Sequence, residues 1–358
     1  MDAPEFSSRN NDPEWPRKVH AVDLFCGIGG LTHGLGLAGV DVRAGVDNDP
    51  ACRYAYEANN EGAAFVEKDV SEVTFDDLKP HYGDSAVRAL VGCAPCQPFS
   101  AHNRHRATTD TDCSLVRHFA RIVREGQPEL VLMENVPGLA SHPAFGELLD
   151  LLRELEYTTS VDPRLSCKQF GVPQNRRRLV LLASLVGPVS LPAGDATPPT
   201  VADCIQGLPP IQAGEAADDD PAHVTLPLSP LNQERIRHSR QGGSWEDWPA
   251  HLRSPCHNDA YYPAPYGRMR WSGIAPTITT QFCYYSTGRF GHPEQDRTIS
   301  IREGAILQTF PTDYRLVDEE NPPTVRDLAR QVGNAVPVEL GRAIGAVFQE
   351  AVFQEAAN

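Results

Sequence analysis

The sequence predicts an α/β protein in which helices cover both faces of a mostly parallel sheet, joined to a small, irregular, β-rich region. Short apolar segments typical of buried strands alternate with helical segments through the first half of the 358 residues. The alternation stops after residue 185, where a stretch rich in Pro, Gly and Ala begins. The first half therefore predicts the sheet, and the second half predicts the smaller region.

The elements of the expected sheet follow one another in a regular order. The first apolar strand, residues 19–25, stops at a run of glycines. Further strands are expected at residues 40–46, 63–67, 89–91, 130–133 and 178–183. Helices are expected at residues 31–38, 50–59, 115–125 and 145–155. In sheets of this kind ligands bind where the strands end, so the residues that follow each strand are the first candidates for a site.

The second half of the chain is expected to be less regular. Residues 188–230 read as linker, and residues 232–291 are rich in aromatic residues, arginine and glycine with little helical period. Residues 302–309 and 338–353 return to helical spacing and are expected to pack back on the large domain. The predicted organisation is an arm (1–17), a large domain (18–190), a linker with a small domain (191–297) and a returning segment (298–358).

The composition excludes several classes of protein. No apolar run is long enough to span a membrane, and the N-terminal residues do not resemble a signal peptide. The nine scattered cysteines form no disulfide framework, so a reducing cytoplasm is expected. The net charge is −15, yet residues 231–297 hold eight arginines against six acidic residues. That local excess of positive charge suits a face that binds nucleic acid.

Acidic residues and glycines follow the first three strands. Asp23 begins a glycine-rich turn before the first helix, and Asp47 and Asp69 follow the next two strands. Glycines at a helix N-terminus let a ligand approach the backbone, and a carboxylate at a second strand end commonly binds a ribose. Together they favour a cofactor with ribose and adenine. Taken singly, the glycines also fit a tight turn, and the two later acids also fit helix caps.

A cysteine between two prolines follows the fourth strand. Cys96 lies on this stiff loop, and Cys93 completes a Cys-x-x-Cys pair with it. Most buried cysteines are inert, but the prolines and the position at the ligand edge favour a reactive thiol. A zinc site would need a second such pair or clustered histidines, and we expect no metal.

Two charged groups follow or precede the last strands of the sheet. Glu134 comes directly after the strand at 130–133, as a helix cap or as a carboxyl held for proton transfer. Arg176, Arg177 and Arg178 lead into the strand at 178–183. Alternation sends Arg176 and Arg178 to one side, where they can bind an anion or orient Glu134. The alternative is the solvated start of a strand.

The ordered set of motifs resembles the DNA (cytosine-5)-methyltransferase family over nearly the whole chain, from about residue 18 to residue 352. Six blocks carry the resemblance in the family's order: DLFCGIGG, VDNDP, APCQPFS, MENVPGL, GVPQNRRR and QVGNAVPV. Each block is weak alone, whereas their order is very specific. The resemblance implies a Rossmann-like, S-adenosylmethionine-dependent catalytic domain, followed by a target-recognition domain.

The resemblance also implies roles for individual residues. The catalytic residues would be Cys96 as nucleophile, Glu134 as the acid that protonates the base, Arg176 fixing that carboxyl and Arg178 holding the pyrimidine carbonyl. The cofactor site would comprise Asp23, Phe25, Cys26, Gly27, Gly29, Gly30, Asp47, Asn48, Asp69, Val70, Pro95, Leu115, Asn334 and Ala335. DNA would be contacted by Gln97, Ser100, Arg104, Arg106, Arg268, Arg270 and Thr277. Cys93 departs from the small or apolar residue common in the family, and we expect it to be structural, or to oxidise with Cys96 if the two thiols lie close enough.

The implied activity is methyl transfer from S-adenosylmethionine to carbon 5 of a flipped-out cytosine in a specific duplex sequence. The expected setting is host DNA modification, restriction–modification or phage defence, with a cognate nuclease or defence proteins as partners. We expect a cytoplasmic, nucleoid-associated monomer. A tRNA cytosine-5 methyltransferase and an inactive DNA-binding relative remain as alternatives. The tryptophans at 245, 248 and 271 are expected to pack in the small domain rather than stack on bases.

Overall fold

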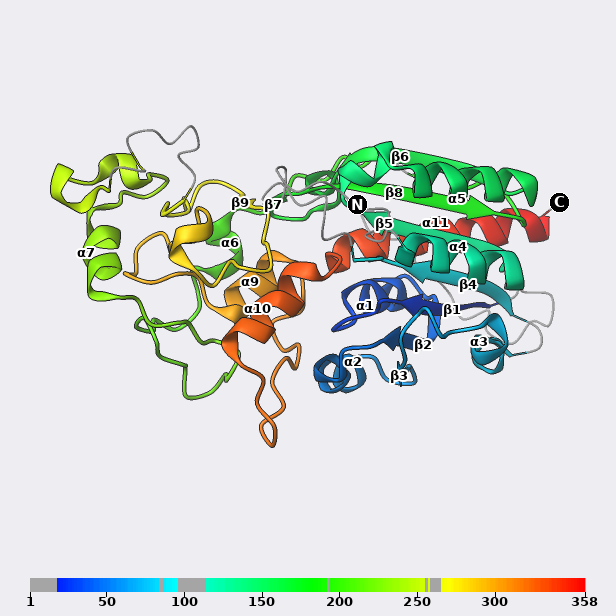
Figure 1. Cartoon of the computed structure of the whole chain (residues 1–358), viewed down its shortest axis with the longest axis horizontal. Helices are drawn as coiled ribbons and strands as arrows, with labels where there is room; N and C mark the ends of the chain where they lie inside the picture. The colour runs from blue at the N-terminus through cyan, green and yellow to red at the C-terminus, as the bar shows by residue number, and fades with distance from the viewer. Residues whose placement is uncertain are drawn as a thin grey trace, which may run out of the picture.

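The computed structural model describes residues 18–83, 86–95, 114–191, 193–254, 257 and 265–357. These residues form two lobes (Figure 1). One lobe is built around a large sheet, and the other contains helices α9 (Ile301–Leu307) and α10 (Val325–Asn334). The chain passes from the first lobe to the second and returns to the first at its C-terminus.

The sheet has seven strands in the order β3-β2-β1-β4-β5-β8-β6. The strands are β1 (Val19–Leu24), β2 (Asp41–Asp47), β3 (Ala64–Glu67), β4 (Val87–Gly92), β5 (Leu130–Asn135), β6 (Thr158–Ser166) and β8 (Arg177–Ser184). The first five are mutually parallel, and β8 runs antiparallel to both β5 and β6. The carboxyl ends of β1 to β5 therefore meet at one edge, as the mostly parallel sheet of the prediction requires.

Helices cover both faces of this sheet. One face packs on α3 (Phe75–Tyr82), α4 (Ser114–Gly126) and α5 (Pro143–Glu154), whose apolar side chains join those of alternate strand residues. The other face packs on α1 (Gly30–Leu37) and the C-terminal helix α11 (Val338–Ala357). Helix α2 (Arg53–Asn59) lies next to β3 at the end of the sheet. The sheet is thus buried on both sides, which explains its continuous apolar strands.

The predicted elements of the first half are all present, with ends that differ by a few residues. Two further elements join them. Helix α3 begins at a capping box formed by Thr74 and Asp77. Strand β6 lies at the sheet edge and buries only Leu165 among its nine residues. Strand β6 lacks the apolar pattern of a buried segment, whereas α3 buries Phe75, Leu78 and Tyr82 at helical spacing, a signal that the sequence prediction missed.

The second lobe has little regular structure. It contains the short helices α6 (Val201–Ile205) and α7 (Pro230–His238), and its strand β9 (Ala275–Pro276) pairs with β7 (Gln174–Asn175). The irregular character is confirmed, whereas the strands in the described part of residues 191–297 are limited to β9 and isolated bridges. The chain there turns instead around an aromatic cluster that includes Trp245 and Trp248. These two tryptophans are buried, as predicted.

The C-terminal segment divides between the lobes. Helix α11 packs beneath the sheet, whereas α9 and α10 belong to the apolar cluster of the second lobe. That cluster extends into the first lobe through Ile28 and Tyr56, and Tyr314 donates to the backbone oxygen of Ile28 at 2.6 Å. The lobes therefore share a core. Among the described residues no helix is long and apolar enough to cross a membrane.

Candidate active site

Glu134 lies at the carboxyl end of β5, in the middle of the sheet. All six residues of β5 are buried, and the Glu134 side chain is only 1% exposed. The next residue, Asn135, donates from its side-chain nitrogen to the backbone oxygen of Ala94 at 2.9 Å. This bond ties the end of β5 to the loop after β4, in which Pro95 is exposed. Cys96, the expected nucleophile, lies outside the described residues, as do Gln97, Ser100, Arg104 and Arg106.

The two carboxyl oxygens of Glu134 have different partners. Oε1 lies 3.0 Å from Nε of Arg178, whose side chain is 13% exposed. The geometry of that ion pair does not form a hydrogen bond, so Oε1 is buried without a hydrogen-bond donor among the described residues. Oε2 accepts a hydrogen bond from the Cys93 thiol, with the sulfur 2.7 Å away. Burial, followed by the charge of Glu134, raises the pKa of this thiol well above its usual value, so Cys93 is a donor.

Arg176 does not contact the carboxyl of Glu134. It is buried, and its two terminal nitrogens donate to the backbone oxygens of Ile278 at 3.1 Å and Ala335 at 3.0 Å. Burial, reinforced by the charge of Arg178, lowers the pKa of its guanidinium to about 10. The expected contact was therefore assigned to the wrong arginine: Arg178 meets the carboxyl, and Arg176 joins the two lobes.

The three glycines after β1 have different surroundings. A Cβ at Gly29 would lie 2.5 Å from Asn60, and one at Gly30 would lie 2.4 Å from the backbone oxygen of Val336. Gly27, with φ +52°, has open space at that position. Only Gly27 therefore leaves its backbone accessible to a ligand, whereas Gly29 and Gly30 permit close packing.

Asp47 and Asp23 support the glycine turn in different ways. Asp47, at the end of β2, accepts hydrogen bonds from the backbone nitrogens of Gly27 and Asp49, each at 2.9 Å. Burial raises its pKa. Asp23 is 1% exposed and accepts a hydrogen bond from the Thr32 hydroxyl at 2.8 Å. Burial raises the pKa of Asp23 to about 7. Asp23 thus joins β1 to α1 through a buried hydrogen bond. A side chain buried in this way does not fit the direct contact with a cofactor that was expected of Asp23.

Polar side chains after β2 and β3 meet at the same edge. The Asn48 amide donates to Asp69 at 3.1 Å, and the backbone nitrogen of Ser71 donates to the other Asp69 oxygen at 2.8 Å. Hydrogen bonds from Ser71 lower the pKa of Asp69, which is therefore ionised at neutral pH. The next residue, Val70, is buried in the core beneath.

The remaining residues of the expected cofactor site lie around this edge. Phe25, in a left-handed conformation with φ 61°, and Leu115, at the start of α4, are partly buried against the core of the sheet. Cys26 is buried and donates its backbone nitrogen to the oxygen of Val46. Asn334 is exposed at the end of α10, and the neighbouring Ala335 approaches the position of a Cβ on Gly30. The structure thus brings the C-terminal residues to the glycine turn.

The arginines expected to contact DNA have opposite surroundings. Arg268 is 4% exposed, and its guanidinium donates to the backbone oxygens of Ile236, Ser239, His292 and Gln295 and to Asp296. The expected base contact of Arg268 is wrong, because every side of its guanidinium is held inside the lobe. Arg270 is exposed and lines a hollow of about 420 Å³ with Arg240 and Arg289.

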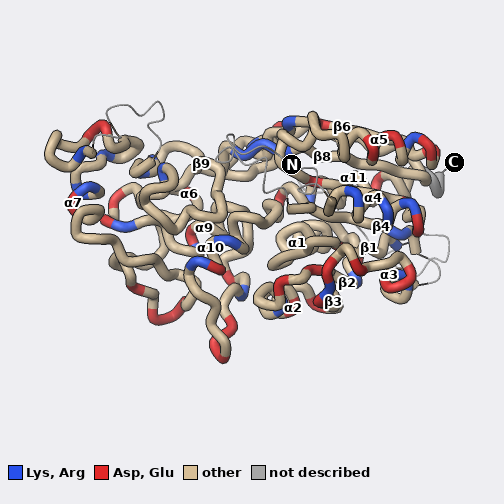
Figure 2. The backbone as a smooth tube through the Cα atoms, viewed as in Figure 1, with Lys and Arg blue, Asp and Glu red and all other residues tan. Residues whose placement is uncertain are grey.

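The join between the lobes carries positive charge. Figure 2 shows a basic stretch at the start of β8, where Arg176, Arg177 and Arg178 follow one another, and acidic residues around α2, β3 and α3. Thr277, which follows β9, donates its hydroxyl to the backbone oxygen of Asn175 at 2.7 Å. In the part of the chain that the structure describes, no cluster of three or more His, Cys, Asp or Glu residues could hold a metal ion.

Sequence reasoning missed the role of two residues in this site. Cys93 was expected to be structural or to oxidise with Cys96, and no contact with Glu134 was expected, yet its thiol contacts that carboxyl. Its place one residue after β4, beside the carboxyl edge of β5, was a usable signal. Arg289 was counted among the eight arginines of residues 231–297 but was not singled out as a base contact, because a lone arginine among glycines and aromatics carries no pattern.

The comparisons with known proteins agree on one family. The family model for C-5 cytosine-specific DNA methylase matches residues 19–350. The type II methylase M.HgiDII of Herpetosiphon aurantiacus is 45% identical over 332 residues, which cover 90% of this chain and 93% of the relative. The type II methyltransferase M.PspPI of Psychrobacter is 30% identical over 343 residues, covering 92% and 78% of the two chains. The Dnmt2 methyltransferase of S. pombe has a similar fold, with a TM-score of 0.64, 20% identity and coverage of 93% and 98%.

Proposed function

Because the chain belongs to the C-5 cytosine-specific DNA methylase family, and is thus a DNA cytosine-5 methyltransferase, we propose that it acts on a flipped-out cytosine through a transient bond to Cys96. The observation that carries this proposal is the buried carboxyl of Glu134, which lies beside Arg178 and has one oxygen with no hydrogen-bond donor in the part of the chain that the structure describes. Asn135 binds Ala94, two residues before Cys96. A carboxyl suited to proton transfer and the segment that holds the thiol therefore start from one edge of the sheet.

The family uses S-adenosylmethionine, and the residues after β1, β2 and β3 fit this cofactor. Open space over Gly27 leaves room at the backbone, and Asp47 is fixed beside it by two backbone donors. We assign the ribose to Asp47 and the adenine amine to Asp69, which is ionised and partly exposed. Phe25 would lie against the adenine, and Asn334 would reach the methionine end. When bound, the cofactor supplies an electrophilic methyl group.

The chain's own residues perform the chemistry on the base. The Cys96 thiolate adds to carbon 6 of cytosine while Glu134 gives a proton to ring N3, so carbon 5 becomes an enamine-like nucleophile that takes the methyl group. Water then removes the proton at carbon 5, and the electrons of that bond re-form the double bond. The sulfur leaves as a thiolate, and the proton on N3 returns to Glu134. Arg178 holds Glu134 and the pyrimidine carbonyl.

This chemistry needs a base that has left the helix, at a cost of roughly a few kcal/mol. The segment that contains Gln97, Ser100, Arg104 and Arg106 would close over the DNA backbone. Sequence reading would fall to Arg270 and Arg289 in the hollow of the second lobe, because arginine forms paired hydrogen bonds with guanine. Thr277 would lie near the phosphate of the flipped nucleotide.

The likeness to M.HgiDII, a type II methylase, supports a proposal for the biological setting. We assign the chain to host DNA modification in a restriction–modification or phage-defence system, with a cognate nuclease or defence proteins as partners. It would act as a monomer in the cytoplasm, associated with the nucleoid.

The test is transfer of a labelled methyl group from the cofactor into mixed-sequence duplex DNA and into tRNA, in parallel. The expected result is label at cytosine carbon 5 in the duplex alone, and a stable adduct with DNA that contains 5-fluorocytosine. Cys96→Ser should abolish both, whereas Cys204→Ser, at a half-buried thiol of the second lobe, should retain both. Label in tRNA alone would make the protein an RNA enzyme. Absence of label and adduct in both substrates would make it a non-catalytic DNA-binding relative.

A further inference from the structure

Cys93 is the residue of the candidate active site for which the family resemblance supplies no role. It follows β4 by one residue, and β4 pairs with β5 in parallel with Gly92 opposite Met133. This register places Cys93 beside Glu134, and the thiol donates to Oε2 at 2.7 Å. The thiol is uncharged, and its neutral S–H is the weakest donor that a side chain offers to a carboxyl.

The two oxygens of Glu134 are therefore not equivalent. Oε2 is held by the thiol, whereas Oε1 lies 3.0 Å from Arg178 without a hydrogen bond from it or from any other described residue. A carboxyl that must both hold and release a proton needs a fixed orientation. It also needs partners that do not lock it in one charge state. A second cation in place of the thiol would favour the ionised form too strongly.

We propose that Cys93 is a positioning residue for methyl transfer: its thiol pins Oε2 of Glu134 and leaves Oε1 to exchange the proton with the cytosine ring. This inference rests on the proposed function, because it assigns the proton transfer to Glu134. The contact itself exists in the protein without substrate and can be tested without activity.

Cys167 provides a matched control. It is a fully buried free thiol whose backbone nitrogen donates to the oxygen of Arg176, and its side chain packs in the core beneath the same strands. Its thiol makes no hydrogen bond to Glu134 among the bonds of the described residues. Cys167→Ala therefore removes a buried sulfur from the same neighbourhood and leaves the carboxyl untouched.

The experiment measures the single-turnover rate of methyl transfer against pH for Cys93→Ala, Cys93→Ser and Cys167→Ala, together with the KM values and the melting temperature. Cys93→Ala should slow transfer roughly 10-fold or more, with KM unchanged. Because Glu134 acts as a proton donor, the limb of the pH profile that reports it is the alkaline one, and that limb should move in Cys93→Ala. Cys93→Ser should recover most of the rate. Cys167→Ala should lower the melting temperature without moving the profile.

Two results would overturn the proposal. One is a Cys93→Ala variant with the rate and pH profile of the wild type, or with a loss no larger than that of Cys167→Ala. The other comes from infrared spectra, in which the S–H band assigned by difference with Cys93→Ala should shift when Glu134→Gln is introduced. An unchanged band would mean that the contact is absent, whatever the activity. An inactive wild type with a shifted band would instead reject the proposed function and leave Cys93 as a partner of Glu134 without a catalytic task.

Discussion

Two buried glutamate–arginine pairs in this chain differ in how many hydrogen bonds their carboxyl groups accept. Glu134 and Glu303 are both 1% exposed. Arg297 binds both oxygens of Glu303, at 2.7 and 2.8 Å, and the backbone nitrogen of Ser300 adds a third bond at 2.6 Å. Arg178 approaches only one oxygen of Glu134 and leaves that oxygen without a hydrogen bond.

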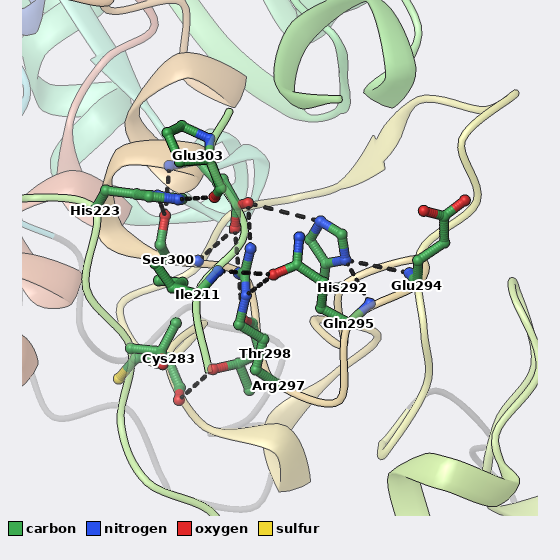
Figure 3. A network of polar contacts seen from close by, with 12 residues as sticks. Ile211, His223, Cys283, His292, Glu294, Gln295, Arg297, Thr298, Ser300 and Glu303 are labelled. Atoms are coloured by element: carbon green, nitrogen blue, oxygen red, sulfur yellow. Dashed lines mark hydrogen bonds and ion pairs between the residues drawn. The ribbon is translucent and has the colours of Figure 1, made fainter. Parts of the chain in front are cut away.

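The surroundings of Glu303 complete the contrast (Figure 3). His292 lies 3.7 Å from its carboxyl, and the Ser300 hydroxyl binds His223 at 2.8 Å. Arg297 also donates to Gln295 and to the backbone oxygen of Thr298. Donors and acceptors are matched around Glu303, and the loop before α9 is fixed by them.

The difference separates a scaffold from a site. A buried polar network with every group paired stabilises one conformation, and it has no capacity left for a ligand. Burying a carboxyl oxygen without a hydrogen bond lowers the stability of the fold, so a structural role does not explain this arrangement. Mutations of the two glutamates should therefore act on different properties, and this expectation orders the predictions that follow.

The largest effect is expected at the incomplete pair. Glu134→Gln keeps the shape of the side chain but cannot give a proton to the base, so methyl transfer should slow by roughly 10²–10⁴-fold. Arg178 is partly exposed and can be hydrated, so the free energy of unfolding should change little. Single-turnover kinetics and urea denaturation measure the two quantities. A variant that keeps more than about a tenth of the wild-type rate would remove Glu134 from the reaction.

Mutation of the pair formed by Glu303 and Arg297 should lower stability and leave the rate of methyl transfer unchanged. Glu303→Gln leaves Arg297, which is fully buried, without its counter-charge, and should cost about 3–5 kcal/mol of the free energy of unfolding. Methyl transfer per folded molecule should be retained at a temperature where the variant is folded. Urea denaturation gives the stability, and active-site titration with 5-fluorocytosine DNA gives the folded fraction. A stable variant that has lost its activity would contradict the division into scaffold and site.

The sequence predicted the sheet better than the elements at its margins. Strands β1, β4 and β5 are buried on both faces, so continuous apolar segments in the sequence predict them. Strand β6 pairs with only one neighbour and exposes most of its side chains, so its pattern resembles that of a loop. Helix α10 buries one face against Thr279 and neighbouring residues, which only the folded chain brings together.

The candidate site divides in a similar way. The motifs identified Glu134 and Asp47, because each lies at the carboxyl end of a strand with an apolar sequence. They did not distinguish Arg176 from Arg178, because alternation assigns a side of the strand and not a partner. Nor did they separate the buried Arg268 from the exposed Arg270, which are only two residues apart. Those differences depend on long-range contacts that no local pattern contains.

The smallest effect is a pH dependence within the complete network. Burial, reinforced by Arg297 and Arg268, lowers the pKa of His292 to about 4, although Glu303 opposes the shift. Between about pH 6.5 and that value the unfolded chain binds more protons than the folded chain, so stability present above pH 6.5 is lost as the pH falls. The loss attributable to His292 is of the order of 1–3 kcal/mol.

The variant His292→Asn isolates this contribution, because an amide oxygen can still accept from the backbone nitrogens of Glu294 and Gln295. It should be less stable than the wild type at about pH 8, since the ring contact with Trp271 is lost. At about pH 5 the difference in the free energy of unfolding between wild type and variant should be smaller, because only the wild type loses stability by keeping an imidazole neutral. Urea denaturation at both pH values measures this difference. Equal differences would show that His292 titrates normally in the fold, and the second lobe would then owe its acid sensitivity to other groups.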